Sequence, residues 1–210
     1  MLTLAFETAN FGASGALIKD KHILAEKTWT EIYGQASFLV PALKALVEEA
    51  GYTFKDVEEV ITTTGPGSFT GQRVGLSIAR TLEVAGGMRV LGVTSFDWIA
   101  RGFVRAHPKT DRPILVTLTT GRSDLFFQLF DNEGKALKDP ISLLPQALGT
   151  YALQGCLIVG QERAALKEQD WQVYEGVWQP HARDLGLILR PLKTALHPFY
   201  LRPVDATPQP

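Results

Sequence analysis

Two groups of residues have the types and spacing that could support chemistry on a phosphate. A glycine-rich turn, Gly65-Pro66-Gly67-Ser68-Phe69-Thr70-Gly71, interrupts an apolar run, and Glu7 follows the apolar residues 2–6. Backbone amides at the start of a helix bind anions, and a carboxylate can orient a metal-bound water. The plainer alternatives stay open, namely a packing turn and a solvent-facing acid at a strand end. The candidate nucleotide-site residues are therefore Glu7, Gly65, Gly67 and Ser68.

Other kinds of reactive site find no support in the residue pattern. The turn lacks the Gly-Lys-Ser/Thr ending of a P-loop, and its third glycine falls one residue late for the dinucleotide fingerprint. No two of the four histidines are spaced three or four residues apart, and no Gly-x-Ser-x-Gly elbow occurs. The single cysteine, Cys156, lies in an apolar run and predicts an inert buried thiol. We expect no catalytic residue, no metal ligand and no cofactor held by this chain alone.

The apolar periodicity predicts the elements that must position these groups. We expect strands at residues 2–8, 12–19 and 22–30 as an antiparallel meander, then at 57–64 and 89–94. Helices are expected at 39–50, from Ser68 or Thr70 to Ala85, and at 95–104. Together these segments form a first α/β lobe, residues 1–106, with a mixed sheet.

A polar, proline-bounded stretch at residues 107–113 predicts the boundary of a second, smaller lobe, residues 107–210. Strands are expected there at 114–119, 124–130, 156–159 and 172–174, and helical segments at 143–152, 161–167 and 182–189. The tail from Pro203 is expected to be loose.

The helix after the glycine turn carries two apolar lines. Val74, Ile78, Leu82 and Ala85 form an ordinary sheet-packing stripe. A second line, Gly71, Gly75 and Ala79, is nearly bare backbone. Since glycine inside a helix costs up to about 1 kcal/mol relative to alanine, this ridge predicts that another backbone comes close.

Composition limits the classes of function. The chain has 210 residues, 45% of them hydrophobic, and a net charge of −1, with 21 dispersed basic residues. That charge does not favour tight nucleic-acid binding by the chain alone. The first residues lack the basic segment and length of a secretion signal, and no apolar run reaches membrane length. One cysteine fits a reducing compartment, so we expect a cytoplasmic protein without membrane contact.

The glycine turn, together with Arg73-Val74-Gly75-Leu76-Ser77-Ile78-Ala79, resembles the signature of the TsaB family. Phe6-Glu7-Thr8 and Pro198-Phe199-Tyr200-Leu201-Arg202 fit the same resemblance. It implies an α/β fold of the actin-like, Hsp70-like ATPase class (ribonuclease H-like), with two lobes of mixed sheet and flanking helices, the second lobe reduced. TsaB proteins are non-catalytic paralogues of TsaD, which they bind, and TsaE docks on that complex. The resemblance thus implies an accessory role in threonylcarbamoyl transfer to an adenosine beside the tRNA anticodon, with ATP used by the complex and tRNA reached only through it.

Three places depart from the family pattern. Glu7 stands where the family has Asp, Ala36-Ser37 where it has His-Ser, and residues 119–122 where it has Asp-Ala-Arg. Each difference removes a polar group from a nucleotide cleft. Two rival functions stay open: a stand-alone ATP-dependent small-molecule kinase of this fold class, and a glycoprotease, for which the residues supply neither metal ligands nor nucleophile.

The bare ridge and the preceding helix suggest how such a partner would bind. We hypothesise that the two helices pair with their counterparts in a TsaD-like protein as a four-helix contact, and that the same face makes a homodimer of the free chain. The interface residues expected from the sequence are Phe38, Leu39, Leu43, Leu46, Gly71, Gly75 and Ala79.

Overall fold

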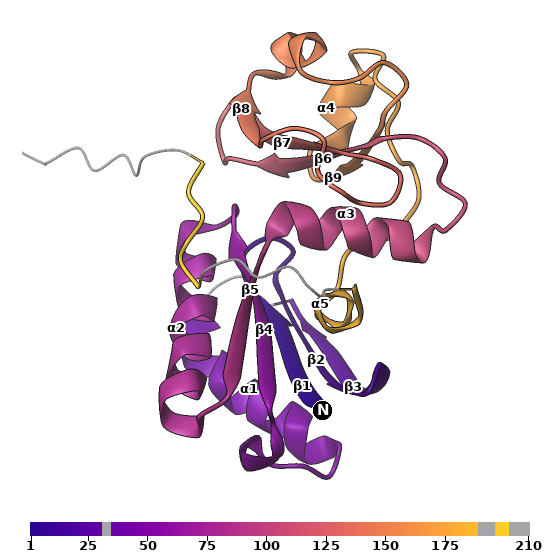
Figure 1. Ribbon diagram of the computed structural model, residues 1–210. Coiled ribbons are helices and arrows are strands. Elements are labelled where there is room, and N and C mark those ends of the chain that lie inside the picture. The colour runs from indigo at the N-terminus through magenta and orange to yellow at the C-terminus, as the bar shows by residue number, and fades with distance from the viewer. Residues whose placement is uncertain (31–34, 189–195, 202–210) are drawn as a thin grey trace, which may run out of the picture.

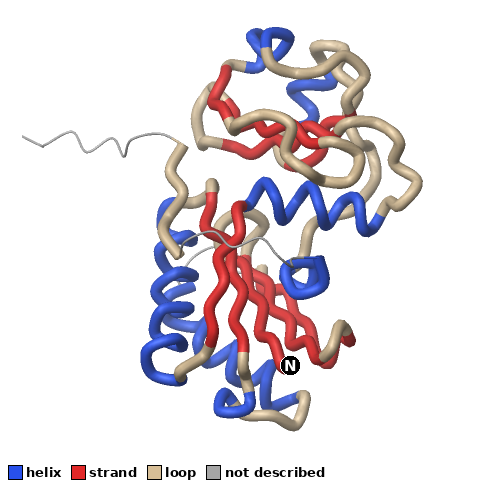
Figure 2. Tube along the Cα trace, in the orientation of Figure 1, coloured by secondary structure: helices blue, strands red, loops and turns tan. Residues whose placement is uncertain are grey.

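Two α/β lobes lie one above the other with a helix between them (Figure 1). The computed structural model describes residues 1–30, 35–188 and 196–201. Figure 2 shows that strands form the centre of each lobe and helices lie outside them. No helix in these three ranges is both long and apolar enough to span a membrane.

The first lobe is built on a five-stranded sheet of order β3-β2-β1-β4-β5. The first three strands form the predicted antiparallel meander, while β4 and β5 add in parallel through helical crossovers. The strands are β1 (Leu2–Glu7), β2 (Ala13–Lys19), β3 (His22–Trp29), β4 (Glu59–Gly65) and β5 (Arg89–Thr94). The connecting elements are α1 (Gln35–Glu49), the 3₁₀ turn η1 (Phe54–Asp56), α2 (Phe69–Gly86) and α3 (Ser95–Ala106).

The second lobe repeats the first four strands of that plan. Its sheet has the order β8-β7-β6-β9, with β6, β7 and β8 antiparallel and β9 parallel to β6. The strands are β6 (Ile114–Thr119), β7 (Leu125–Phe130), β8 (Ile141–Leu143) and β9 (Leu157–Gly160). The 3₁₀ segment η2 (Pro145–Thr150) lies between β8 and β9, and α4 (Arg163–Lys167) follows β9. The lobe is reduced, as predicted, because no described strand takes the place of β5.

Three apolar cores hold these layers together. The first lies between one face of the first sheet and helices α1 and α2. The second joins the opposite face of that sheet to α3 and to one face of the second sheet, and Phe96, Trp98 and Phe103 of α3 are among its largest buried side chains. The third covers the outer face of the second sheet and includes Cys156, which is buried as predicted.

The C-terminal part of the chain corrects the predicted division at residue 107. Helix α5 (Ala182–Ile188) packs against β1, β2 and α3, so it belongs to the first lobe. Its anchors are Ala182, whose amide donates to Ser14 Oγ at 3.0 Å, and Leu185, which is fully buried. Residues 196–201 return to α2 (Figure 1). The tail predicted to be loose lies outside the described residues.

Three local predictions for the second lobe were wrong. Strand β8 was missed because three half-buried residues carry no readable alternation. The helix predicted at 143–152 is the shorter 3₁₀ segment η2. The strand predicted at 172–174 is a single bridge between Ile158 and Val173.

Candidate functional site

The glycine turn is the strand–turn–helix unit that the sequence predicts. Gly65 ends β4 with φ of +104°, a conformation that glycine adopts most easily, and the Gly65–Pro66 peptide is cis. Ser68 caps α2, because its Oγ accepts the Gly71 amide at 3.2 Å. The Ser68 amide donates to the carbonyl of Ala9 at 2.7 Å. The amide and hydroxyl of Ser68 are thus both used within the chain.

The turn packs directly against the loop that follows β1. A Cβ at Gly67 would lie 2.6 Å from the carbonyl oxygen of Ala9, so a side chain there would displace this loop. The side-chain Nδ2 of Asn10 donates to the carbonyl of Pro66 at 3.2 Å and to Ser95 Oγ at 2.8 Å. This arrangement supports the packing interpretation of the glycines and leaves no space between turn and loop for a phosphate.

Glu7 lies beneath the same loop and is only 1% exposed. Its Oε1 accepts hydrogen bonds from the backbone amide of Ala9 at 2.6 Å, from Thr63 Oγ1 at 3.3 Å and from the side-chain Nδ2 of Asn10 at 3.4 Å. Burial raises the pKa of Glu7 to about 7, and these hydrogen bonds oppose the rise. The interpretation of Glu7 as a solvent-facing strand-end acid is therefore wrong. Among the described residues, no three metal-ligating side chains gather closely enough to hold an ion.

The bare ridge of α2 faces the chain itself. A Cβ at Gly71 would lie 2.1 Å from the carbonyl oxygen of Thr8, and one at Gly75 would lie 2.5 Å from Thr8 Oγ1. Ala79 is fully buried in the core beneath α2. The close backbone predicted from the sequence thus exists, but it is the end of β1. The assignment of Gly71, Gly75 and Ala79 to a partner interface is corrected accordingly.

The apolar residues chosen on α1 are also internal. Leu39 and Leu43 are fully buried, Leu46 is 1% exposed, and all three pack in the core against the first sheet. Phe38 is half-buried against the same core. These side chains are needed to cover the sheet, so they do not form the surplus apolar surface expected from the sequence.

The exposed faces of α1 and α2 carry a different pattern that the sequence reasoning missed. Ala85, predicted to lie in the sheet-packing stripe, is exposed and belongs to this pattern, so its placement in that stripe was wrong. Small uncharged residues recur at i, i+4 and i+8 on each helix: Ser37, Pro41 and Ala45 on α1, and Ser77, Thr81 and Ala85 on α2. Beside them, Val40 is 45% exposed and Val84 is 86% exposed. The helical spacing was readable, but only the buried stripes could show which face remains outside.

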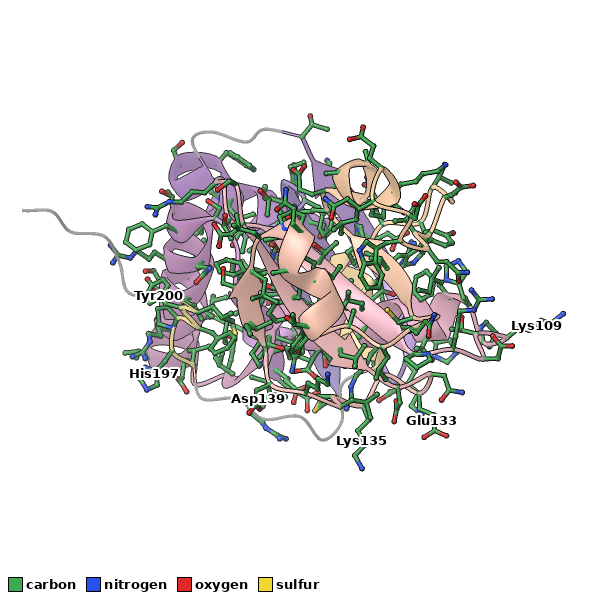
Figure 3. All side chains as sticks on the ribbon, turned by 90° about the horizontal axis from the view of Figure 1, so that it is seen from above. Lys109, Glu133, Lys135, Asp139, His197 and Tyr200 are labelled. Atoms are coloured by element: carbon green, nitrogen blue, oxygen red, sulfur yellow. The ribbon has the colours of Figure 1, made fainter. Side chains whose placement is uncertain are left out.

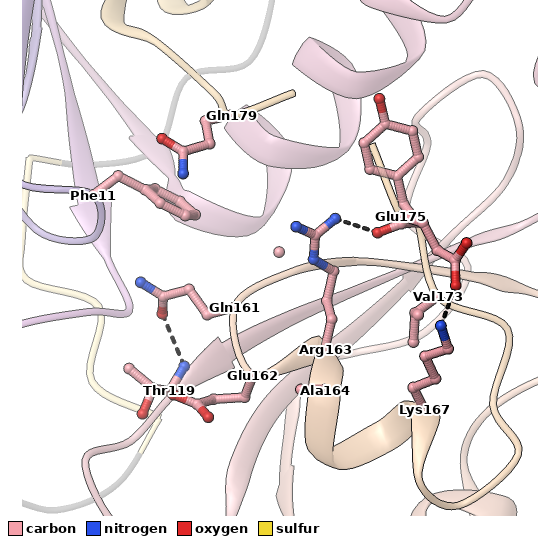
Figure 4. Close-up of a pocket in the computed structure, with 12 residues that line it drawn as sticks. Phe11, Thr119, Gln161, Glu162, Arg163, Ala164, Lys167, Val173, Glu175 and Gln179 are labelled. Atoms are coloured by element: carbon pink, nitrogen blue, oxygen red, sulfur yellow. Dashed lines mark hydrogen bonds and ion pairs between the residues drawn. The ribbon is translucent and has the colours of Figure 1, made fainter. Parts of the chain in front are cut away.

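The side chain of Gln161, just after β9, bridges the two lobes. Its Nε2 donates to the carbonyl of Asn10 at 2.8 Å, and its Oε1 accepts the Thr119 amide at 3.0 Å. Figure 4 shows the bond to Thr119. Gln161 therefore links the loop after β1 to the second lobe. No residue pattern signalled this role, since a single glutamine beside Gly160 has no distinctive spacing.

A cavity of about 570 Å³ lies beside Gln161 (Figure 4). The two basic side chains that line the cavity have partners within the chain: Arg163 donates to the carbonyl of Tyr174, and Lys167 forms an ion pair with Glu175. Phe11, from the first lobe, forms an aromatic wall of the cavity. Its ring packs edge-on against Trp98, with the two ring centroids 6.1 Å apart.

Comparison with known proteins places this geometry in a family. A family model described as "TsaD: tRNA N6-adenosine threonylcarbamoyltransferase" matches residues 35–149, more than half of the chain. The chain belongs to this family. Within it the chain is of the TsaB/YeaZ type, a distant paralogue of TsaD.

The curated relatives include proteins named "tRNA threonylcarbamoyladenosine biosynthesis protein TsaB". The Bacillus subtilis protein is 27% identical over 100 residues, which cover 48% of this chain and 44% of the relative. The Escherichia coli protein is 29% identical over 111 residues, covering 52% of this chain and 47% of the relative. The matched regions span less than half of these relatives. The structure of YeaZ from Pseudomonas aeruginosa has a TM-score of 0.74 at 20% identity and covers 89% of each chain.

The fold is the actin-like ATPase fold, with two mixed-sheet lobes and flanking helices. This fold class implies a nucleotide between the lobes, and the described residues do not fit one. Gln161 bridges the two lobes, the Ser68 amide is bonded to Ala9, and Glu7 is buried beneath the loop. We therefore derive no nucleotide chemistry for this chain.

Proposed function

We propose that this chain is a cytoplasmic accessory subunit of tRNA threonylcarbamoyladenosine formation, which binds a TsaD-like enzyme and does not itself catalyse the reaction. Membership of the TsaB/YeaZ type supports the pathway. The observation that carries the non-catalytic role is the use of Glu7 and the glycine turn in internal hydrogen bonds. Groups that would bind phosphate or metal in an active relative here stabilise the scaffold.

In this proposal the TsaD-like partner transfers the threonylcarbamoyl group to an adenosine beside the anticodon. ATP is used by the complex, and a TsaE-like protein docks on it. This chain supplies a rigid surface and reaches the tRNA within the complex. Its lobes are fixed relative to each other by α3, whose side chains pack in the core shared by both lobes, and by Gln161.

The proposed docking surface is the exposed face of α1 and α2. The small-residue stripes on this face, together with the exposed Val40 and Val84 beside them, contain no charged residue. Small residues let helix axes approach closely. A partner helix that covers an exposed valine removes apolar surface from water, which stabilises the complex. Two partner helices on this face would complete a four-helix contact, and the same face would pair two copies of the free chain.

Co-purification tests the proposal. The chain, tagged at its C-terminal end and expressed in its native cell, is expected to bring down a TsaD-like protein in comparable amount. Val84→Arg and Ala45→Arg place a charge on the docking surface without entering the core, so each should lower recovery of the partner at least tenfold. Val177→Arg is the matched control, since Val177 is 99% exposed in the second lobe. Equal recovery with all variants would refute this surface.

The rival kinase function makes a different prediction about the isolated chain. It requires Mg²⁺-dependent ATP binding and turnover without a partner. Calorimetry with Mg²⁺ and ATP is expected to show no binding, because the Gln161 side chain and the Ser68 amide already form hydrogen bonds within the chain. Stoichiometric binding accompanied by turnover would favour the kinase and contradict the accessory role.

A further inference from the structure

Two exposed aromatic rings meet at the N-terminal end of α2. Phe69 is 41% exposed and Tyr200 is 37% exposed, and they are the aromatic members of the exposed large apolar side chains in the described ranges. Their centroids are 5.7 Å apart. Arg73 joins them, with its guanidinium carbon 3.7 Å from the centroid of Phe69 and its Nε donating to the Tyr200 hydroxyl at 3.2 Å.

The chain segments that carry these rings hold no acid before Glu83, which lies one turn beyond Arg80 on α2. No Asp or Glu occurs between Glu59 and Glu83, nor in residues 196–201. Arg80 lies two turns beyond Arg73 on α2. It donates to the carbonyl of Leu196 at 2.8 Å, and its guanidinium lies 3.4 Å from His197 Nδ1. We call Phe69, Arg73, Arg80, His197 and Tyr200 the α2–tail platform. Figure 3 shows Tyr200 and His197 together at one edge of the molecule, far from Lys109.

The platform is held in place by the chain behind it. The Phe199 amide donates to the carbonyl of Thr64 at 2.7 Å. Leu196 packs against the core beneath α1 and α2, while Phe199 and Leu201 pack against the core between the lobes. Because the segment is anchored on both sides, a ligand that stacks on Tyr200 would not have to order it first.

We propose that the α2–tail platform binds a single-stranded RNA segment, such as the unpaired bases of an RNA loop. Bases stack on aromatic rings and on guanidinium planes, and phosphates pair with arginine. The platform offers two rings, one guanidinium beside them and a second arginine along the same helix, and none of its five residues is acidic. The proposal rests on the proposed function, whose substrate adenosine lies in such a loop.

The exposed pair of rings favours an RNA over a protein helix as the occupant of the platform. A helix needs a groove or a flat apolar stripe, and that feature lies on the small-residue face of α1 and α2. The platform instead combines protruding rings with positive charge. Since the chain as a whole has a charge of −1, binding should be weak and confined to this patch.

Fluorescence anisotropy of the full chain with a labelled seven-nucleotide RNA tests the proposal. Wild type is expected to bind, and the logarithm of the association constant should fall with the logarithm of salt with a slope of about −1.4, because each of two arginines contributes about −0.7 on a single strand. Tyr200→Leu, which removes the ring but keeps an apolar side chain, should weaken binding about tenfold. Arg73→Gln should weaken binding and flatten the salt dependence.

The matched control is Lys109→Gln, which removes one exposed cation at the far side of the molecule and should bind as wild type. Circular dichroism verifies that each variant is folded. Absence of RNA binding by wild type at several hundred micromolar, or equal binding by Tyr200→Leu, would overturn the proposal. Loss of TsaD-like partner recovery in Tyr200→Leu with RNA binding unchanged would also overturn it and assign the platform to a protein. Intact partner recovery with lost RNA binding supports the platform and leaves the accessory role standing.

Discussion

Thr8 Oγ1 donates a hydrogen bond of 2.8 Å to the carbonyl of Gly71, across 63 positions of sequence. The contact brings the end of β1 onto the first turns of α2, where the Cβ position of Gly71 would lie 2.1 Å from the carbonyl oxygen of Thr8. The glycines of α2 therefore set the distance between helix and sheet. The conformational cost of glycine in a helix is offset by this packing.

Gly71→Ala should destabilise the protein by about 3 kcal/mol, the upper end of overpacking costs, because the added methyl group meets backbone and not a side chain that could rotate away. Denaturant unfolding measures the change. Gly149→Ala is the control, since a Cβ there meets nothing within 4 Å. If both variants unfold at the same denaturant concentration, the close contact at Thr8 is not a constraint on the fold.

Glu7 should make stability depend on pH. The folded-state pKa of about 7 lies above the ordinary value of 4.5 for a glutamate, so between these values the folded state binds more protons than the unfolded state. The contribution of Glu7 to the free energy of unfolding should therefore fall by about 3 kcal/mol as pH rises from 4.5 to 7.5, and level off outside that window. Denaturant unfolding of wild type and Glu7→Gln at several pH values isolates this slope. A constant difference between the two proteins would contradict the raised pKa.

Gln161→Ala should loosen the junction between the lobes. The change leaves the carbonyl of Asn10 and the amide of Thr119 without this partner, and an unsatisfied buried group costs about 1–3 kcal/mol. Hydrogen exchange at the Thr119 amide should accelerate, and thermal stability should fall. Gln179→Ala, in the wall of the same cavity, should change neither. Unchanged exchange at Thr119 in Gln161→Ala would count against the link.

Cys156 should resist thiol reagents in the folded protein. Its side chain is 1% exposed, and burial raises the pKa of the thiol. A colorimetric disulfide reagent at pH 8 should react only after denaturant is added. Val177→Cys supplies an exposed thiol as the control and should add one rapidly reacting group per chain. Two fast thiols in that variant would show that Cys156 is accessible.

Local sequence patterns determined the elements of the first lobe. The β-branched run before Gly65, the glycine turn and the cap at Ser68 predicted β4 and α2 within a few residues, because each signal acts over one turn or one strand. The same holds for the antiparallel meander at the start. In the second lobe the signals weaken, since β8 and the bridge at Val173 depend on neighbouring strands for their hydrogen bonds.

The tertiary structure alone decided what each buried face contacts. Periodicity showed that Gly71 and Gly75 needed a close neighbour and that Leu39 and Leu43 needed cover; whether that neighbour was a partner or the chain itself depended on the path of β1. Burial of Glu7, the span of Gln161 and the return of α5 to the first lobe have the same origin. A residue pattern indicates which apolar side chains must be buried, whereas only the folded structure shows which part of the chain covers them.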